Sequence, residues 1–145
     1  MTLREGRTSP KVVTGMLFVF GYPIATLLDP GAMHSFISYQ LAVLAPIPAS
    51  PLPEMWRMYH LSGDVEQVGW VYLNCEIFVE SFVLTVDLMQ LDIVDFDVIL
   101  GMDFLEAHRA MFDSHSKEVL FRSLDFPEIL FVETKCPHRL VSFKR

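Results

Sequence analysis

The stretch TLLDPGAMHSFIS, residues 26–38, places one acidic residue between an apolar run that favours a β-strand and a Pro-Gly pair. Taken alone, Asp29-Pro30-Gly31 predicts a turn. Proline presets φ at the second turn position, and glycine tolerates the positive φ that the third position of a type II turn requires. Asp29 is therefore either a turn residue or a group with chemistry to perform, and the rest of the chain decides between these interpretations.

The composition describes one domain of unusual apolarity. The chain has 145 residues, of which 52% are hydrophobic and only 20% charged, so it can build a sizeable core and has apolar surface left for another use, such as a subunit interface. The apolar run 16–28 is broken by Gly21 and Pro23 and is too short to span a bilayer as a helix. No secretory signal pattern opens the chain, so we expect a cytoplasmic protein that does not bind membranes.

Charge and cysteine content exclude further classes of function. The net charge is −7 and no basic stripe is present, which argues against nucleic-acid binding by this domain. Cys75 and Cys136 lie far apart without metal-ligand spacing, so we expect two free, buried thiols. The histidines show no zinc spacing either, and we predict no metal and no cofactor.

The first half of the chain predicts mainly β-structure. KVVTGMLFVFGYPIATLL, residues 11–28, gives two apolar β-rich runs around GYP and predicts a hairpin covered on both faces. Residues 35–45 have roughly helical spacing and could form a short helix. PIPASPLP, residues 46–53, has four prolines and predicts an extended connector. Residues 57–91 follow as a series of strands, with the best turn signal at Ser62-Gly63-Asp64.

A second strand-to-turn unit occurs at residues 97–108, DVILGMDFLEAH. It predicts a strand over 97–100 and a short helix that starts near Asp103, because Asp103 followed by Glu106 fits an acidic variant of the capping box. KEVLFR, residues 117–122, predicts a closing strand. In both ATLLDPGA and DVILGMDF, the apolar end of a strand is followed directly by a glycine-containing turn. This weak internal similarity is typical of a pseudo-twofold arrangement.

These segments together resemble a known family. LLDPGAMHSFIS resembles the active-site loop of the retropepsin-like aspartic proteases encoded by gypsy-type long-terminal-repeat retrotransposons, especially those of plants. LDIVDFDVILGMDFLEAHRAMFDSHSKEVLFR resembles the second signature of that family, and PEILFVETKCPHRLVSF resembles its connector toward reverse transcriptase. The resemblance covers roughly residues 12–143.

The resemblance implies an all-β, closed-barrel acid protease fold with one short helix near the C-terminal side. Each chain would supply one catalytic aspartate, Asp29, within an active-site loop that includes Pro30, Gly31 and Ala32. The flap would be formed around Leu61, Ser62, Gly63 and Asp64. Ile99, Leu100, Gly101 and Asp103 would form the structural motif. Because the chain holds a single Asp-x-Gly unit and is too short for two lobes, activity would require a homodimer.

The implied chemistry is hydrolysis of an extended peptide or polyprotein between two Asp29 carboxyl groups. Two carboxyl groups held close together share one proton, so the ionised group can activate water while the protonated group polarises the peptide carbonyl. Two departures weaken this expectation. Pro30 stands where active members have serine or threonine, whose hydroxyl bonds to the partner loop, and Met33 stands where threonine is usual. The alternatives are an inactive module that dimerises or binds peptides, and a decaying reading frame.

Other acidic residues have simpler interpretations. We interpret Asp103 as a helix cap rather than a second catalytic acid. Asp92, Asp95 and Asp97 precede a strand, so solvated edge charges are a better interpretation than a metal site. We expect a structural role for His34. The predicted organisation is a flexible lead-in over 1–10, a protease domain over 11–123 and a connector toward a following polyprotein domain over 124–145.

Overall fold

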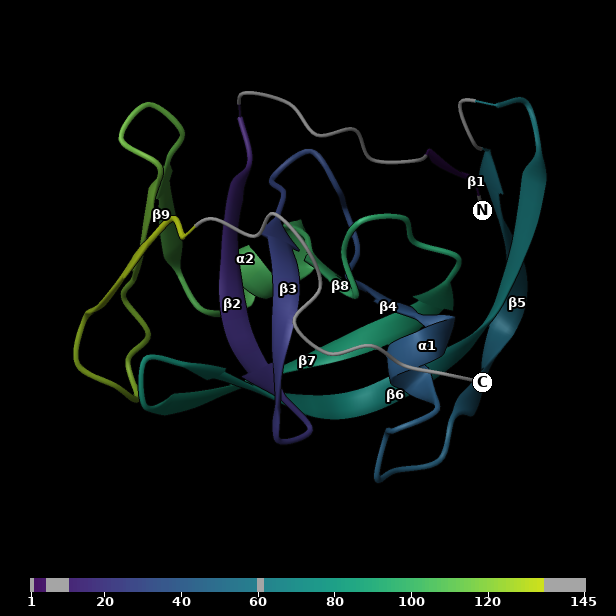
Figure 1. The fold of residues 1–145 in the computed structure, drawn as a ribbon, viewed down its shortest axis with the longest axis horizontal. Coiled ribbons are helices and arrows are strands. Elements are labelled where there is room, and N and C mark those ends of the chain that lie inside the picture. The colour runs from purple at the N-terminus through teal and green to yellow at the C-terminus, as the bar shows by residue number, and fades with distance from the viewer. Residues whose placement is uncertain (1, 5–10, 60–61, 135–145) are drawn as a thin grey trace.

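A computed structural model describes residues 2–4, 11–59 and 62–134 of the chain. It is mainly β, as predicted, with two short helices among the described residues (Figure 1). The strands are β1 (Thr2–Arg4), β2 (Val13–Val19), β3 (Tyr22–Leu28), β4 (Phe36–Ser38), β5 (Ser50–Tyr59), β6 (Val65–Val79), β7 (Phe82–Leu91), β8 (Val98–Leu100), β9 (Ala110–Asp113), β10 (Glu118–Phe121) and β11 (Ile129–Val132). The helices are α1 (Tyr39–Ala42) and α2 (Met102–Ala107).

The large sheet closes on itself. Its strand order is β1-β5-β6-β2-β3-β8-β4-β7, and β6 also pairs with β7, so the strands from β6 to β7 form a ring. The long strand β6 makes this closure because it bends at a bulge between Tyr72 and Cys75, where Asn74 has a φ of 55°. A bulge adds a residue to one strand and increases its bend. One half of β6 therefore pairs with β5 and the other half with β7.

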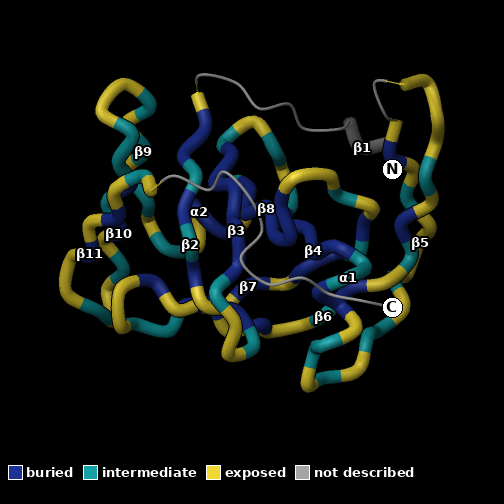
Figure 2. Tube along the Cα trace, in the orientation of Figure 1, coloured by how far each residue is buried: buried dark blue, intermediate teal, exposed yellow. Residues whose placement is uncertain are grey.

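The predicted hairpin over 11–28 is present as β2 and β3, with the turn at Phe20 and Gly21 rather than at Gly21 to Pro23. Both turn residues have positive φ, which is the conformation of a tight hairpin turn whose twist matches that of the strands. Strand β3 is buried from Ile24 onward, but Phe18 on β2 is half exposed. The hairpin is therefore covered on both faces along most of β3 and only in part along β2 (Figure 2).

The proline-rich stretch 46–53 is only in part a connector. Strand β5 begins at Ser50 and contains Pro51 and Pro53. Its pairing with β6 is interrupted between Pro51 and Trp56, because a proline has no N–H to donate to the neighbouring strand. The expected extended conformation is found, but its second half belongs to the sheet.

Segments at both ends of the chain take part in the fold. Within the predicted lead-in 1–10, residues Thr2–Arg4 form β1 and pair in parallel with β5. Within the predicted connector 124–145, residues Ile129–Val132 form β11, which pairs with β10. The side chains of Ile129 and Phe131 are buried in the main core. A folded region therefore continues past residue 124, and residues 135–145 lie outside the described part.

Strand β11 is attached to the large sheet through β2. Glu133 accepts hydrogen bonds from the backbone N–H of Thr14 at 3.0 Å and from its hydroxyl at 3.3 Å, and the N–H of Thr134 donates to the carbonyl of Thr14 at 3.1 Å. Phe131 packs where a side chain on Gly15 would lie, because a Cβ there would be 2.0 Å from the Phe131 ring. Gly15 thus lets β11 pack closely against β2.

Cys75 is a free, buried thiol, as predicted, and burial raises its pKa to about 12. Cys136 lies outside the described residues. In the described part of the chain, no helix is long and apolar enough to cross a membrane.

Candidate active site

Asp29 follows the last residue of β3, at a point held by β8. The two strands run in parallel with Leu28 opposite Leu100, and the backbone N–H of Asp29 donates to the carbonyl of Leu100 at 2.9 Å. The two strand-to-turn units that echo each other in the sequence are therefore neighbours in the sheet. This hydrogen bond fixes the start of the Asp29 loop to the buried strand β8.

Asp29, Pro30 and Gly31 do form a turn, but not the predicted type II turn. The N–H of Ala32 donates to the carbonyl of Asp29 at 3.1 Å, which closes the turn with Pro30 in its second position. Gly31 is not among the described glycines with positive φ, which are Gly21 and Gly63. Proline fits the second position of several turn types, so the Pro-Gly pair does not by itself determine the φ of the glycine.

The Asp29 carboxyl group is partly enclosed by its own turn. The residue is only 7% exposed, and the N–H of Gly31 donates to Oδ1 at 2.8 Å. Burial raises the pKa of Asp29, and the Gly31 bond counters this in part. A Cβ on residue 31 would lie 3.1 Å from Oδ1. Asp29 is thus a proton-binding group in a low-polarity setting, with one backbone donor that fixes its orientation.

Gly101 allows the loop and the second motif to approach closely. A Cβ at this position would lie 2.3 Å from the carbonyl oxygen of His34 and 2.5 Å from that of Ala32, both of which are backbone atoms. The neighbouring N–H of Met102 donates to the carbonyl of Ala32 at 2.7 Å. The site loop therefore rests directly on the backbone between β8 and α2, where no side chain fits.

Asp103 ties the start of α2 to the loop, and its predicted role as an N-cap is wrong. The N-cap residue is Gly101, which has no side chain, and Asp103 lies in the first turn. Its Oδ1 accepts a bond from the hydroxyl of Ser35 at 2.6 Å and one from the N–H of Phe104 at 2.8 Å. The same Ser35 hydroxyl accepts a bond from the N–H of Gly101 at 3.0 Å. The hydroxyl of Ser35 thus connects the loop to Gly101 and Asp103 of the second motif.

Asp97 is not the solvated edge charge that we predicted. It is 1% exposed, and its Oδ1 accepts a bond from the hydroxyl of Ser38 at 2.7 Å. Ser38 is also the N-cap of α1, where it accepts a bond from the N–H of Leu41 at 3.1 Å. Asp92 and Asp95 are exposed as predicted. A buried carboxylate requires hydrogen-bond donors, so Asp97 has a structural role beneath the site.

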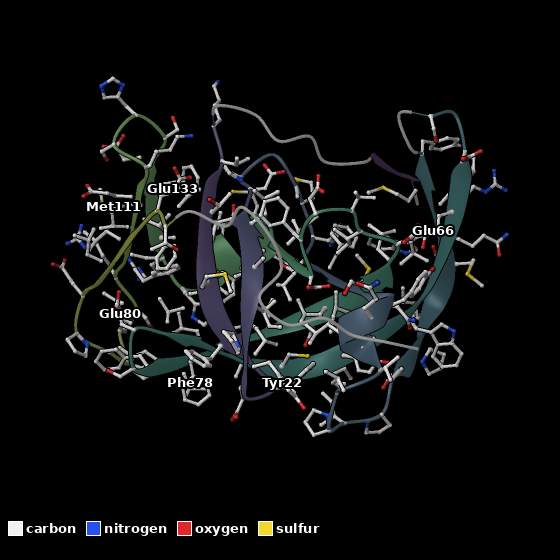
Figure 3. All side chains as sticks on the ribbon, viewed as in Figure 1. Tyr22, Glu66, Phe78, Glu80, Met111 and Glu133 are labelled. Atoms are coloured by element: carbon white, nitrogen blue, oxygen red, sulfur yellow. The ribbon has the colours of Figure 1, made fainter. Side chains whose placement is uncertain are left out.

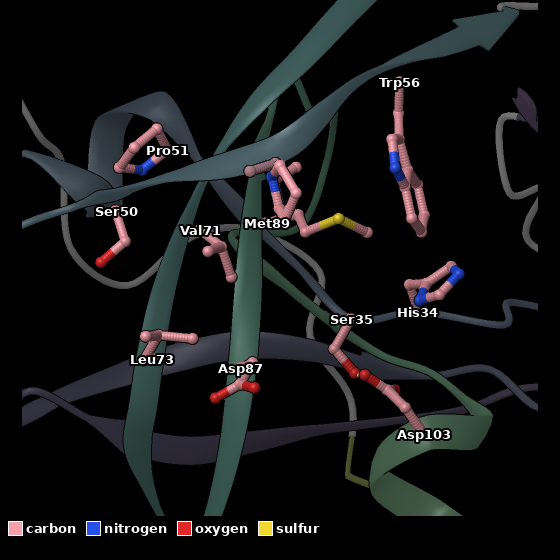
Figure 4. Close-up of a pocket in the computed structure, with 12 residues that line it drawn as sticks. His34, Ser35, Ser50, Pro51, Trp56, Val71, Leu73, Asp87, Met89 and Asp103 are labelled. Carbon is pink, nitrogen blue, oxygen red and sulfur yellow. The ribbon is translucent and has the colours of Figure 1, made fainter. Parts of the chain in front are cut away.

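A pocket of about 390 Å³ lies beside the site loop, under β5 (Figure 4). His34, Ser35 and Asp103 form one wall, and the opposite side is mainly apolar. The His34 and Trp56 rings meet edge to face with centroids 4.5 Å apart, and Figure 4 shows the two side chains facing each other. The remaining lining residues are Ser50, Pro51, Leu52, Pro53, Val71, Leu73, Asp87 and Met89. The site loop and β5 thus border a space with a polar wall on the loop side and a mainly apolar opposite side.

The described residues of the predicted flap lie between β5 and β6. Ser62, Gly63 and Asp64 are exposed, Gly63 has a φ of 96°, and Leu61 lies outside the described residues. Ser62 and Asp64 line a separate groove with Tyr39, Glu66 and Asp92. The structure therefore brings the Asp29 loop and the 99–103 motif together in one site. In this single chain, the hairpin turn belongs to another groove.

Residues 1–125 match the family model described as retroviral aspartyl protease. The chain belongs to this family. Among the solved structures, the fold is similar to the retroviral protease-like domain of Ddi1 from Leishmania major, with a TM-score of 0.55 and 11% sequence identity. That match covers 83% of this chain and 94% of the Ddi1 domain. No curated protein matches this chain.

Membership of the retroviral aspartyl protease family agrees with the central position of the Asp29 loop. Four residues of the site were missed or given another role from the sequence, namely Ser35, Ser38, Asp97 and Asp103. The sequence does contain a signal for Ser38, because a serine directly before residues of helical spacing is a typical N-cap. The partnership between Ser38 and Asp97 had no such signal, since it joins residues that are far apart in the chain.

Proposed function

We propose that this chain is a homodimeric aspartic endopeptidase of the gypsy-type retrotransposon class that cuts a polyprotein in the cytoplasm. The observation that carries the proposal is the buried Asp29 carboxyl group. Burial raises its pKa, so it tends to hold a proton, and its loop lies within the residues that match the family model. One such loop per chain supplies one carboxyl group. A second copy, related by a twofold axis, would supply the other.

In the proposed dimer, the two Asp29 carboxyl groups share one proton and titrate as a pair. The ionised carboxylate takes a proton from a water molecule, which attacks the peptide carbonyl, and the protonated carboxyl group polarises that carbonyl and then assists the leaving amine. The peptide would bind in an extended conformation against the β5–β6 hairpin, by main-chain hydrogen bonds. The pocket beside His34 and Trp56 would accept one of its side chains.

Pro30 sets the expected level of this activity. Proline offers neither a hydroxyl nor an N–H, so it cannot donate across the twofold axis to the partner loop. Each lost bond is worth about 1 kcal/mol, and symmetry doubles the loss. The closed turn at Asp29 accommodates Pro30 in its second position, so we place the defect in the dimer contact rather than in the fold of the loop.

The second candidate is a module that dimerises or binds extended peptides without cutting them. Pro30 and the 69% exposed side chain of Met33 favour it, since Pro30 replaces the hydroxyl that joins the loops in active members and Met33 replaces the usual threonine.

The deciding experiment is a cleavage assay on the purified natural chain with a peptide library, between about pH 4 and 7. Inhibitor-sensitive cleavage that Asp29→Asn abolishes, and that the control Asp95→Asn at an exposed carboxylate leaves intact, would establish the enzyme. Peptide binding without cleavage, with activity recovered in Pro30→Ser combined with Met33→Thr, would establish the inactive module on a sound scaffold. A repaired chain that dimerises and cuts nothing would contradict the assigned role of Pro30.

A further inference from the structure

Glu66 occupies an inward-facing position in the β5–β6 hairpin. It lies opposite Met58 in the register of the two strands, and side chains of directly paired residues lie on the same face. Met58 is 2% exposed, and Val68, two residues along the same face of β6, is fully buried. The pattern of the hairpin thus places a carboxylate where its neighbours are apolar. Glu66 itself is only partly buried, and withdrawing part of its carboxylate from water has a cost that hydrogen-bond donors offset.

The donors come from two other parts of the molecule. The hydroxyl of Tyr39, at the start of α1, donates to Oε2 of Glu66. The backbone N–H of Asp92, just after β7, lies 2.9 Å from Oε2 and 3.2 Å from Oε1. The Glu66 carboxylate therefore joins β6, α1 and the loop after β7. Figure 3 shows Glu66 at the hairpin, away from the strands β2 and β3.

The Tyr39 hydroxyl stays a hydrogen-bond donor in this contact because its pKa is raised. Burial, the hydrogen bond to Glu66 and the negative charges of Glu66 and Asp92 all raise the pKa of the Tyr39 hydroxyl. The hydroxyl therefore keeps its proton at physiological pH. A hydrogen bond to a charged acceptor is about twice as strong as one between neutral groups. These three groups border an open groove of about 540 Å³ that the hairpin turn also lines.

The hairpin reaches the site by its other strand. Trp56 on β5 packs on His34 of the loop that follows Asp29, and β5 covers the pocket beside that loop. The position of the hairpin thus depends on two contacts. Trp56 contacts the site loop, and Glu66 contacts α1 and the loop after β7. Apolar packing of Met58 and Val68 also holds the hairpin, but such contacts do not select one position as sharply as a directional bond does.

We propose that Glu66 is a positioning residue that anchors the β5–β6 hairpin to α1 and the loop after β7, and so sets the height of β5 over the peptide-binding pocket. Glu66 acts through the hairpin and does not touch the peptide. Its effect on the peptide rests on the proposed function, in which the hairpin binds substrate. The anchor itself does not depend on catalysis and can be tested without it.

Amide hydrogen exchange on the full chain tests the anchor. Glu66→Ala removes the acceptor, and we expect amides of residues 55–59 and 65–70 to exchange about tenfold faster, while those of β3 and β8 stay unchanged. Tyr39→Phe removes one donor with little change of shape and should give a smaller acceleration at the same amides. Glu66→Gln keeps a carbonyl acceptor for the Asp92 N–H and should restore most of the protection.

The matched control is Glu76→Gln, which removes an exposed carboxylate from the same strand and should leave the exchange unchanged. Unchanged hairpin exchange in both Glu66→Ala and Tyr39→Phe would overturn the proposal, because apolar packing would then suffice. Equal acceleration in the hairpin and in β3 would overturn it as well, since it would show a general loss of stability. In a chain that cuts peptides, Glu66→Ala should raise KM more than it lowers kcat. Absence of cleavage combined with faster hairpin exchange would contradict the proposed function and leave the anchor standing.

Discussion

Around Asp29, burial and hydrogen bonding act on the carboxyl group in opposite directions. Burial raises its pKa, and the Gly31 N–H, 2.8 Å from Oδ1, lowers it in part. A group whose pKa is raised in the folded state contributes its full stability below its unfolded pKa, and this contribution is lost as the pH rises through the folded pKa. Ionisation of Asp29 therefore lowers the free energy of unfolding at neutral pH. The ionised form is also the one that would activate water in the proposed mechanism.

Asp29→Asn should therefore increase the stability of the folded chain at pH 7. The amide oxygen keeps the bond from Gly31, and the buried charge is gone. At about pH 3, where the carboxyl group is protonated in both states, the gain should disappear. Urea unfolding at the two pH values measures the difference. A variant that is less stable than the natural chain at pH 7 would show that the charge of Asp29 is favourably solvated in the loop.

Gly101→Ala should destabilise the chain by about 1–3 kcal/mol, because a methyl group would meet two fixed carbonyl oxygens of the site loop. Gly69→Ala is the matched control. Its methyl group would meet only the end of the Met55 side chain, with the sulfur at 2.8 Å and Cε at 3.2 Å, and Met55 is an exposed and flexible side chain. Equal unfolding midpoints for the two variants would mean that the loop can move away from residue 101 at little cost.

At the level of strands and helices, local patterns predicted what depends on local chemistry. The apolar runs of β2 and β3, the strand before Gly101 and the short helix α2 all follow from residue type and turn signals. The cap of α2 was assigned wrongly, because Asp103 and Glu106 have the right spacing while the tight contact at Gly101 determines where the helix begins. The burial of Asp97 and the inward position of Glu66 depend on partners from other segments, which no local pattern contains.

Strand β11 belongs to the same class of long-range features. The ILFV run, residues 129–132, is short and apolar on both faces. The sequence therefore did not indicate that Ile129 and Phe131 are the side chains that enter the core. Full burial of one large apolar side chain contributes about 1.5–3 kcal/mol, so the two together reach a sizeable share of the stability of a typical domain. The family match ends at residue 125, before this strand.

A chain that ends at residue 125 should therefore be much less stable than one that ends at residue 134. We expect a loss of about 3–6 kcal/mol, from the two buried side chains alone. Urea unfolding followed by circular dichroism compares the two chains. A third chain that ends at residue 134 and carries Phe131→Ala should lose about half of this amount or more. Equal stability of the two truncated chains would mean that β11 only covers a core that is already complete.

In the homodimer that we propose, Pro30 lies at the contact between the two active-site loops, and its substitution should change the strength of dimerisation. In the monomer, Pro30→Ser should cost up to about 1 kcal/mol, because serine gives the unfolded chain more freedom. In the dimer, two symmetric hydroxyl groups should gain about 2 kcal/mol in all, which corresponds to a roughly 30-fold lower dimer Kd.

Sedimentation equilibrium on the natural chain and on Pro30→Ser measures this change. Pro48→Ser, at an exposed proline before β5, is the control for the general effect of losing a proline and should leave the dimer Kd unchanged. A Pro30→Ser chain that dimerises no better than the control would remove the dimer contact as the explanation for a weak enzyme. Recovery of dimerisation without recovery of cleavage would direct attention to Met33.

The packing of β11 against β2 at Gly15 also sets the order of events during synthesis. Thr14 and Glu133 are joined by hydrogen bonds although they are 119 positions apart, so β2 is made long before the strand that completes its packing. A ribosome-bound chain cannot finish this sheet until residues 129–134 have emerged, and contacts between distant residues form slowly. In a polyprotein, the appearance of a folded domain would thus be timed by translation past residue 134.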